Sequence, residues 1–326
     1  MTAVARSLPQ REAPVDRLGR IEPYANRLHT AVQNLLTQRC VSVSPFRSLA
    51  RDLLLDVRER PELQAVLPEP GPSPDDRPIA PDSPAESAVY TAGIQTARLI
   101  AWTASHRQAW LDRRELITTA ALLQDVGLLL VTTGRPMTPR QLLADRPQLF
   151  RRHPEFGAAL AGGITDSAVD LPQLIAQHHE RLDGTGYPRQ TVSRHLPETS
   201  RFLAIAVRFV ELWHEVLKQE NRGSNRPRHL AVTGVQADVS HRDAAEALFR
   251  EAVRGDWDRT LVIGLLESLG FRISDQSMFA DEIPRSMALS RFGRLMIRTD
   301  TSHATIRQPR QTSAPRTAAA SHPAEQ

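Results

Sequence analysis

The chain of 326 residues contains a single cysteine, Cys40, and a single lysine, Lys218. One cysteine excludes an intramolecular disulfide and any metal cluster held by several thiolates of this chain. Because lysine is nearly absent, arginine carries almost all of the positive charge, and the formal net charge is +4. Arginine suits bidentate contact with phosphate, but so general a bias is explained more simply by codon usage. A nucleic-acid surface is therefore disfavoured.

Long apolar runs are also missing. The longest candidate, residues 126–131, is far shorter than the roughly 20 apolar residues that cross a bilayer. The first residues show no signal-peptide pattern. We therefore expect a cytoplasmic protein that makes no membrane contact. An apolar share of 40% suits a globular protein with polar tails.

Helical periodicity dominates what is present. Apolar residues recur at helical spacing in many segments, and only residues 295–299 suggest a strand. The predicted fold class is therefore all-α. The longer helices are expected at about residues 21–38, 44–57, 84–105, 112–131, 147–161, 170–181, 197–219, 240–253 and 257–269, with a short helix at 139–145.

Composition divides the chain into segments. Prolines and acids in PEPGPSPDDRPIAPDSP cannot support a packed helix, and the last residues are mostly Ser, Thr, Ala, Pro and Arg. The predicted order is a disordered leader (1–20), a helical N-terminal extension (21–67), a Pro-rich linker (68–84), the main helical domain (85–275), a C-terminal extension (276–300) and a disordered tail (301–326).

The most distinctive stretch is IAQHHERLDGTGYP, residues 175–188. Neighbours on a helix point about 100° apart, so His178 and His179 can meet at one point only where the chain bends. The two glycines and the proline that follow favour such a bend, because glycine frees the backbone and proline stops a helix. A purely structural turn is the plainer alternative.

Three further segments accompany it, namely ALLQDVGLLL (121–130), HPEFGAAL (153–160) and RFLAIAVRFVELW (201–213). Together with DGTGYP they resemble the HD-GYP family, metal-dependent phosphohydrolases of the HD superfamily that cleave cyclic di-GMP. The resemblance covers roughly residues 43–270 and implies an HD-type helical bundle. It also implies a pair of divalent metals that share a hydroxide and clamp the phosphorus during attack.

The resemblance places Asp125, His153, His178 and His179 at the ligand positions of one metal. Three imidazoles and a carboxylate suit iron, manganese or zinc. Asp125 is also the candidate catalytic residue. Each residue alone has a plainer explanation as a polar helix end or a satisfied buried group, so a protein without metal stays an alternative.

The other half of the expected site is altered. Gln124 occupies the position of the HD histidine, Val207 that of a late aspartate, and Leu128 that of a lysine that meets the substrate phosphate in the family. The upstream helix normally offers a histidine, but none lies between His29 and His106. A neutral amide is a poor ligand for a catalytic transition metal, and valine is no ligand.

The glycine-rich loop is the second candidate site, comprising Asp183, Gly184, Gly186, Tyr187 and Pro188. By resemblance this loop is implicated in activity and in contacts with partner signalling domains such as GGDEF cyclases. Three arginines lie close to it in sequence and are candidates for phosphate contact, with a solvated surface as the plainer explanation. They are Arg189, Arg194 and Arg201.

The leading hypothesis is a divergent HD-GYP-type domain in cyclic di-GMP signalling with weak or lost phosphodiesterase activity, a pseudoenzyme in the extreme case. It would act by binding cyclic di-GMP, a related nucleotide or a protein partner. One alternative is an active metal-dependent phosphohydrolase on cyclic di-GMP or another phosphoester. A second is a helical interaction scaffold. Whether the chain is an enzyme, and its oligomeric state, stay open at this point.

Overall fold

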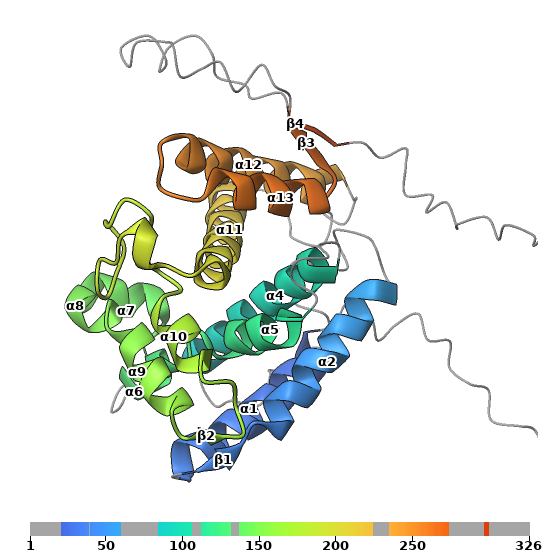
Figure 1. The fold of residues 1–326 in the computed structure, drawn as a ribbon. Coiled ribbons are helices and arrows are strands. Elements are labelled where there is room, and N and C mark those ends of the chain that lie inside the picture. Colours follow the sequence, from blue (N-terminus) through green and yellow to red (C-terminus); the bar gives the residue numbers. More distant parts are fainter. Residues whose placement is uncertain are drawn as a thin grey trace, which may run out of the picture.

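The computed structural model describes residues 21–38, 40–59, 84–105, 112–131, 137–223, 235–273 and 297–299. These segments are mainly helical (Figure 1), which confirms the all-α prediction. The predicted leader and tail, nearly all of the Pro-rich linker and most of the C-terminal extension lie outside the described residues.

Four helices form the N-terminal part of the structure. They are α1 (Glu22–Thr37), α2 (Ser44–Glu59), α4 (Pro84–Ser105) and α5 (Arg114–Leu123). In Figure 1, α4 and α5 run together through the middle of the molecule, and α2 packs against both. The apolar residues of α4 do not form a single stripe, and Tyr90, Ile94 and Leu99 are fully buried. A helix that is apolar on most sides belongs in the centre of a fold.

Short helices follow in the middle of the chain. They are α6 (Gly127–Val131), α7 (Pro139–Asp145), α8 (Pro147–Phe150), α9 (His153–Ala161) and α10 (Leu171–Ala176). Proline lies in the first turn of α7 to α10, where its missing N–H costs nothing. Thr138 caps α7 in a reciprocal capping box with Gln141.

The C-terminal part is built from three longer helices, preceded by the 3-10 turn η3 (Ser193–His195). They are α11 (Glu198–Gly223), α12 (Val235–Val253) and α13 (Arg259–Ser268). Asp258 caps α13 by accepting the backbone N–H groups of Thr260 and Leu261. Helix α11 packs against α12 and also reaches α4, α5 and α10, so it spans both parts of the molecule (Figure 1).

Two small strand pairs complete the described structure. β1 (Val41–Ser42) pairs in parallel with β2 (Ile164–Thr165), and β3 (Phe271–Ile273) pairs antiparallel with β4 (Ile297–Thr299). The strand suggested by residues 295–299 thus corresponds to β4. The first pair was not predicted, because two residues are too few to show alternation.

The prediction of one continuous helix over residues 112–131 is wrong. Helix α5 ends at Leu123, and the next backbone bonds run to the third residue back, as from Val126 N–H to the Leu123 carbonyl. Gly127 then starts α6 against α9, where a Cβ would lie 2.0 Å from the His153 carbonyl oxygen. The break therefore lets the chain pass close to another backbone. The helices predicted over 147–161 and 170–181 are likewise shorter, because turns interrupt them.

One apolar core joins the N-terminal and C-terminal helices. Leu28 and Phe46 belong to the same buried cluster as Phe202, Trp213 and Leu248. The helices predicted as an N-terminal extension therefore share a core with the predicted main domain. The domain boundaries themselves stay predictions.

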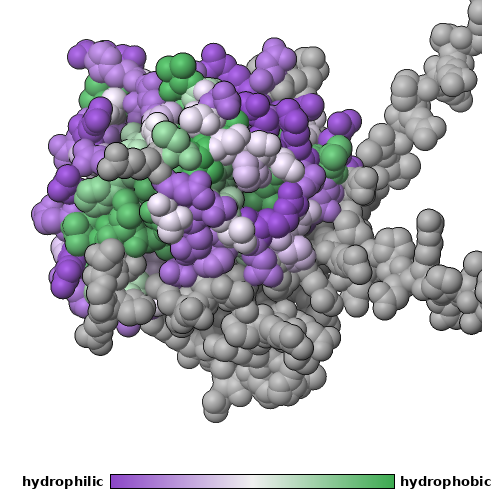
Figure 2. Space-filling model, turned by 90° about the horizontal axis from the view of Figure 1, so that it is seen from below, coloured by the Kyte–Doolittle hydropathy of each residue, from purple (hydrophilic) through white to green (hydrophobic). Residues whose placement is uncertain are grey.

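Within the residues that the structure describes, no helix combines the length and apolar character needed to cross a bilayer. Figure 2 shows a face on which purple hydrophilic residues predominate, with smaller green hydrophobic patches between them. Scattered apolar exposure of this kind is ordinary for a folded protein.

Candidate metal centre

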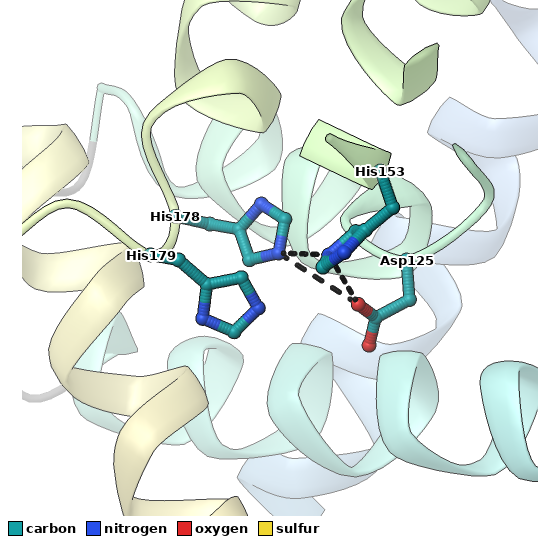
Figure 3. Close-up of side chains that lie close together, drawn as sticks. All are labelled: Asp125, His153, His178 and His179. Atoms are coloured by element: carbon teal, nitrogen blue, oxygen red, sulfur yellow. Dashed lines mark hydrogen bonds and ion pairs between the residues drawn. The ribbon is translucent and has the colours of Figure 1, made fainter. Parts of the chain in front are cut away.

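Four polar side chains from three different chain segments meet at one point (Figure 3). Asp125 lies in the turn between α5 and α6, and His153 is the first residue of α9. His178 and His179 lie in the turn after α10. Helices α6 and α10 both pack against α9, and this packing brings the three segments together.

The distances within this cluster suit a single ion. Oδ1 of Asp125 lies 3.2 Å from Nε2 of His153 and 3.7 Å from Nε2 of His178. The two Nε2 atoms are 3.1 Å apart, and one ligand atom from each of the four residues lies within 4.8 Å of all the others. An ion with ligands at about 2.1 Å requires donor separations of roughly 3 to 4 Å. Most of the cluster is therefore already at metal-binding spacing.

Backbone carbonyls orient two of the three histidines. Nδ1 of His153 lies 2.7 Å from the Phe150 carbonyl oxygen, and Nδ1 of His178 lies 2.6 Å from the Ile175 carbonyl oxygen. A carbonyl only accepts, so each Nδ1 carries a proton, and in the neutral imidazole each Nε2 turns a lone pair toward Asp125. Lone pairs facing each other at 3.1 Å repel unless a proton or a metal cation lies between them. This donor set therefore fits a divalent metal.

The pKa shifts of Asp125, His153 and His179 favour the protonation states that a metal needs. Burial alone would raise the pKa of Asp125, but hydrogen bonds from the His153 and His178 rings, and the positive charge of these rings when protonated, hold that pKa well below the ordinary value. Burial lowers the pKa of His153, and the pKa of His179 falls well below 6.5 through burial and the neighbouring imidazoles. An ionised carboxylate and neutral imidazoles are the forms that bind metal.

The altered half of the expected site lies directly beside this cluster. The Gln124 amide donates 3.3 Å to Oδ2 of Asp125 and 3.4 Å to the hydroxyl of Thr96. Val207 is 3% exposed and belongs to the apolar core, and Leu128 packs in a small apolar cluster. The second oxygen of Asp125 therefore meets a neutral donor, and only Oδ1 faces the histidines.

The glycine-rich loop closes over His179. Gly184 has φ +76°, which favours glycine, and a Cβ on Gly186 would lie 2.5 Å from the Arg181 backbone nitrogen. Tyr187 donates its backbone N–H to the His179 carbonyl and stacks its ring on the imidazole with centroids 4.5 Å apart. The loop therefore fixes one face of a candidate ligand.

Glu180 holds this loop and was not predicted as a site residue. Its carboxylate is buried and accepts the backbone N–H groups of Arg189 and Thr191, each at 2.8 Å. Asp183 makes a smaller turn by accepting from the N–H and hydroxyl of Thr185. Pro188 lies in the chain segment between Glu180 and Arg189, whose two ends are joined by the hydrogen bond from the Arg189 N–H to the Glu180 carboxylate. In the sequence, the only signal for this role was an acid placed directly after the histidine pair.

A pocket of about 510 Å³ opens beside the cluster and shares His179 with it. Its described walls carry cationic side chains from several elements and aromatic rings. The cations are Arg151, Arg181, Arg208 and Lys218, and the rings are Phe150, Tyr187 and Trp257. Such a lining suits an anionic ligand that also presents flat rings.

The three arginines that the sequence analysis proposed for phosphate contact do not line this pocket. Arg201 pairs with Asp258 at 2.7 Å, and Arg194 contacts His195. Among the described residues that line the pocket, neither these two nor Arg189 occurs. Their role in phosphate binding stays a prediction. The pocket arginines come instead from the α8–α9 turn, the segment between the histidine pair and the glycine-rich loop, and α11, which only the fold brings together.

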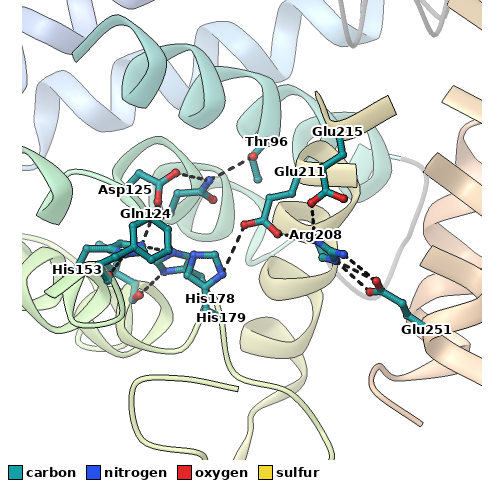
Figure 4. A network of polar contacts seen from close by, with 12 residues as sticks. Thr96, Gln124, Asp125, His153, His178, His179, Arg208, Glu211, Glu215 and Glu251 are labelled. Atoms are coloured by element: carbon teal, nitrogen blue, oxygen red, sulfur yellow. Dashed lines mark hydrogen bonds and ion pairs between the residues drawn. The ribbon is translucent and has the colours of Figure 1, made fainter. Parts of the chain in front are cut away.

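Carboxylates occupy the pocket face of α11 (Figure 4). Arg208 makes a bidentate contact with Glu251 at 2.8–3.2 Å, and its Nη1 donates to Glu211 at 3.2 Å and Glu215 at 3.3 Å. Arg151, in contrast, has no carboxylate partner among the described residues and lies 5.8 Å from the Tyr187 ring centroid. Of these two arginines, Arg151 is therefore the one available to a bound anion.

Comparison with known proteins gives related sequences. Residues 77–231 match the family model described as HD domain. The cyclic di-GMP phosphodiesterase response regulator RpfG of Xanthomonas campestris is 35% identical over 92 residues, which cover 28% of this chain and 24% of the relative. The 3'3'-cGAMP-specific phosphodiesterase 2 of Vibrio cholerae is 25% identical over 139 residues, covering 40% of this chain and 27% of the relative.

The matched segments span only about a quarter of each of these relatives. A solved structure, an HDG"Y"P protein from Bdellovibrio bacteriovorus, aligns with a TM-score of 0.49 and 17% identity. That alignment covers 76% of this chain and 70% of the other.

Proposed function

Since the chain is an HD domain protein distantly related to HD-GYP cyclic di-GMP phosphodiesterases, we propose that it binds a cyclic dinucleotide at a centre with one divalent transition metal and hydrolyses it weakly. The observation that carries this proposal is the cluster of Asp125 and three histidines at metal-binding spacing. The metal would be iron, manganese or zinc, as nitrogen and carboxylate ligands prefer.

The restriction to one metal rests on the altered half. A second ion would need its own ligands beside Asp125, where Gln124 offers an amide N–H to Oδ2 instead. Val207 lies in the core at the position of the expected aspartate. The Gln124 amide oxygen is buried without a hydrogen-bond partner, but one neutral oxygen beside an N–H donor and an apolar side chain is too small a ligand set to replace the hydration of a second divalent ion.

The pocket fits the ligand class. A cyclic dinucleotide presents phosphodiester anions and purine rings, and the pocket offers arginine side chains and aromatic rings in a volume of about 510 Å³. Ligand pockets of small molecules commonly hold roughly 300–1,000 Å³. Arg151 can pair with a phosphate, and Tyr187 or Trp257 can stack on a base.

The expected chemistry follows from these positions. Asp125 and the three histidines would hold the ion, which when bound supplies Lewis-acid polarisation of a phosphoryl oxygen. Arg151 would orient the phosphate, and the glycine-rich loop would exclude water from one side of His179. Two-metal sites stabilise both the attacking and the leaving oxygen. With a single ion, and with Leu128 at the position of a cationic side chain, the negative charge on either the attacking or the leaving oxygen has no positive partner. Hydrolysis is therefore expected to be slow.

Calorimetry with cyclic di-GMP tests the proposal. Manganese-loaded protein is expected to bind the nucleotide, and the Asp125→Asn variant, treated in the same way, is expected to lose both metal and most of the affinity. Turnover is expected well below the ~1 s⁻¹ at the low end of ordinary enzymes. Metal-loaded protein that fails to bind the nucleotide would refute the proposed ligand.

A second candidate function is an active one-metal phosphohydrolase that acts on another phosphoester. The observation in its favour is that the four ligands of one metal are all present, with the proton of two histidines already on Nδ1. Hydrolysis of bis-p-nitrophenyl phosphate by the manganese-loaded protein at ordinary enzyme rates, lost in Asp125→Asn, would favour this candidate.

A further inference from the structure

The three histidines of the cluster differ in what holds their outer nitrogen. Backbone carbonyls of their own segments hold Nδ1 of His153 and of His178. Nδ1 of His179 instead faces Oε1 of Glu211, a side chain of another helix, across 3.8 Å. In Figure 3 the His179 ring presents one nitrogen toward Asp125 and turns the other away.

Glu211 lies four residues after Val207 on α11. Residues four apart share one face of a helix. The face that lacks the aspartate of the family at position 207 therefore carries a carboxylate one turn further along. Figure 4 shows this carboxylate between His179 and Arg208.

Arg208 fixes the direction of the Glu211 carboxylate. Its guanidinium donates to Oε2 of Glu211 at 3.2 Å, while Oε1 is the oxygen nearer His179. Arg208 is itself held by the bidentate contact with Glu251. The carboxylate thus has one oxygen anchored and one directed at the imidazole.

A histidine that ligates a metal nearly always donates its other N–H to a carboxylate, a carbonyl or water. We propose that Glu211 is the positioning residue of His179 in the metal centre, accepting its Nδ1–H and directing its Nε2 toward the ion. This inference rests on the proposed metal site. The present 3.8 Å exceeds hydrogen-bond distance, and a cation on Nε2 makes Nδ1–H more acidic, which strengthens the contact.

Glu215 provides a matched control. It lies one turn further along α11, lines the same pocket and accepts from the same Nη1 of Arg208 at 3.3 Å. It is exposed, and within the described part of the chain no contact joins it to the histidines. Substitution of Glu215 therefore removes a comparable charge and the same kind of ion pair without touching His179.

The test compares Co²⁺ binding to wild-type protein, Glu211→Gln and Glu215→Gln, each checked for an unchanged thermal transition in chelator. Affinity is measured by competition with a chromophoric chelator, and the visible absorption of bound Co²⁺ reports the ligand field. We expect Glu211→Gln to weaken binding about 10-fold or more and to shift the absorption bands. Glu215→Gln should stay within about twofold, with unchanged bands.

Wild-type affinity and an unshifted spectrum in Glu211→Gln would overturn the inference, as would equal losses in the two variants. If wild-type protein itself bound no Co²⁺, the proposed metal site would fail first. The two failures are therefore distinguishable in one experiment.

Discussion

The intact and altered halves of the candidate site lie side by side in the same fold but are built differently. In the intact half, carbonyls of Phe150 and Ile175 hold two imidazoles with their lone pairs facing one carboxylate. In the altered half, Gln124 satisfies the other oxygen of that carboxylate with a hydrogen bond, and Val207 fills apolar space. The first arrangement offers ligand atoms that suit a cation, whereas the second offers Asp125 an amide N–H and leaves only the Gln124 amide oxygen without a partner.

The comparison teaches that the frame of the proposed metal site does not depend on the residues at positions 124 and 207. The four candidate ligands are held by the ends of α9 and α10 and by the close approach of α6 to α9. These supports are backbone contacts, so substitutions at positions 124 and 207 leave them in place.

The sharpest way to break the comparison is to remove one ligand from the intact half. His178→Ala should lower the affinity for Mn²⁺ by about 1,000-fold, or about 4 kcal/mol, because three donors and an open position replace the complete set. Competition with a fluorescent chelator measures this. Val207→Ala, in the altered half, should keep the affinity within about threefold. A loss of similar size in both variants would show that the two halves are not distinct.

The backbone support of the intact half can be tested at Gly127. In Gly127→Ala the new Cβ would meet the His153 carbonyl oxygen at 2.0 Å and the Gly157 nitrogen at 2.6 Å, so α6 and α9 must separate. We expect a loss of about 3 kcal/mol in the free energy of unfolding, the upper part of the range for overpacking. Urea denaturation measures it.

Gly162→Ala is the control for this change. Gly162 ends α9 with a helical backbone, and the nearest atom to its Cβ is a carbonyl oxygen of the preceding turn at 3.2 Å. The free energy of unfolding of Gly162→Ala should fall by less than about 1 kcal/mol. Equal effects of the two substitutions would mean that the close approach at Gly127 does not support the site.

The next prediction concerns the pH dependence of stability that His214 of α11 causes. His214 lines the pocket and contacts Gln95 at 2.8 Å. Burial lowers the pKa of His214 to about 4. The unfolded chain, with a pKa of roughly 6.5, therefore binds the proton first, and stability is lost as pH falls from 6.5 to 4. This pKa difference corresponds to at most about 3 kcal/mol in the free energy of unfolding.

His214→Gln should remove this part of the acid dependence in chelator-treated protein, as followed by thermal unfolding at successive pH values. His195→Gln, at an exposed position, should leave the profile unchanged. If His214→Gln loses stability between pH 6.5 and 4 as steeply as wild type does, His214 is not a source of that dependence.

The smallest expected effect concerns the pocket next to the intact half. Arg151→Ala should weaken cyclic di-GMP binding about 10-fold, or about 1.4 kcal/mol, because a charge-assisted contact with phosphate is lost. Calorimetry with metal-loaded protein measures this. The adjacent Arg152 is paired with Glu155 at 3.2 Å and lies over Phe156, away from the pocket. Arg152→Ala should therefore change affinity by less than about twofold, and the reverse order would place the phosphate elsewhere.

Much of the fold followed from the sequence, because helical periodicity and proline positions are local signals. The capped helix after Thr138 and the start of α4 at Pro84 lie where they were predicted. The break after Leu123 could not be predicted, because it depends on Gly127 meeting the backbone of α9. Local apolar periodicity continues through that turn and hides it.

The candidate site was likewise predictable from the sequence only in part. The motif order singled out Asp125 and the three histidines, and the structure brings these four together. Proximity in sequence favoured Arg189, Arg194 and Arg201 for phosphate, but the pocket draws its arginines from three distant segments. Glu180 and Glu211 act through contacts that exist only in the folded chain. For Glu180 the sequence offered only an acid directly after the histidine pair, and for Glu211 no local pattern pointed to the site.

Metal stoichiometry tests the central claim most directly. Protein saturated with Mn²⁺, passed over a desalting column and measured by elemental analysis, should retain one ion per chain, and His178→Ala should retain none. Two ions per chain in the wild-type protein would contradict the account of the altered half. No retained ion would contradict the account of the intact one.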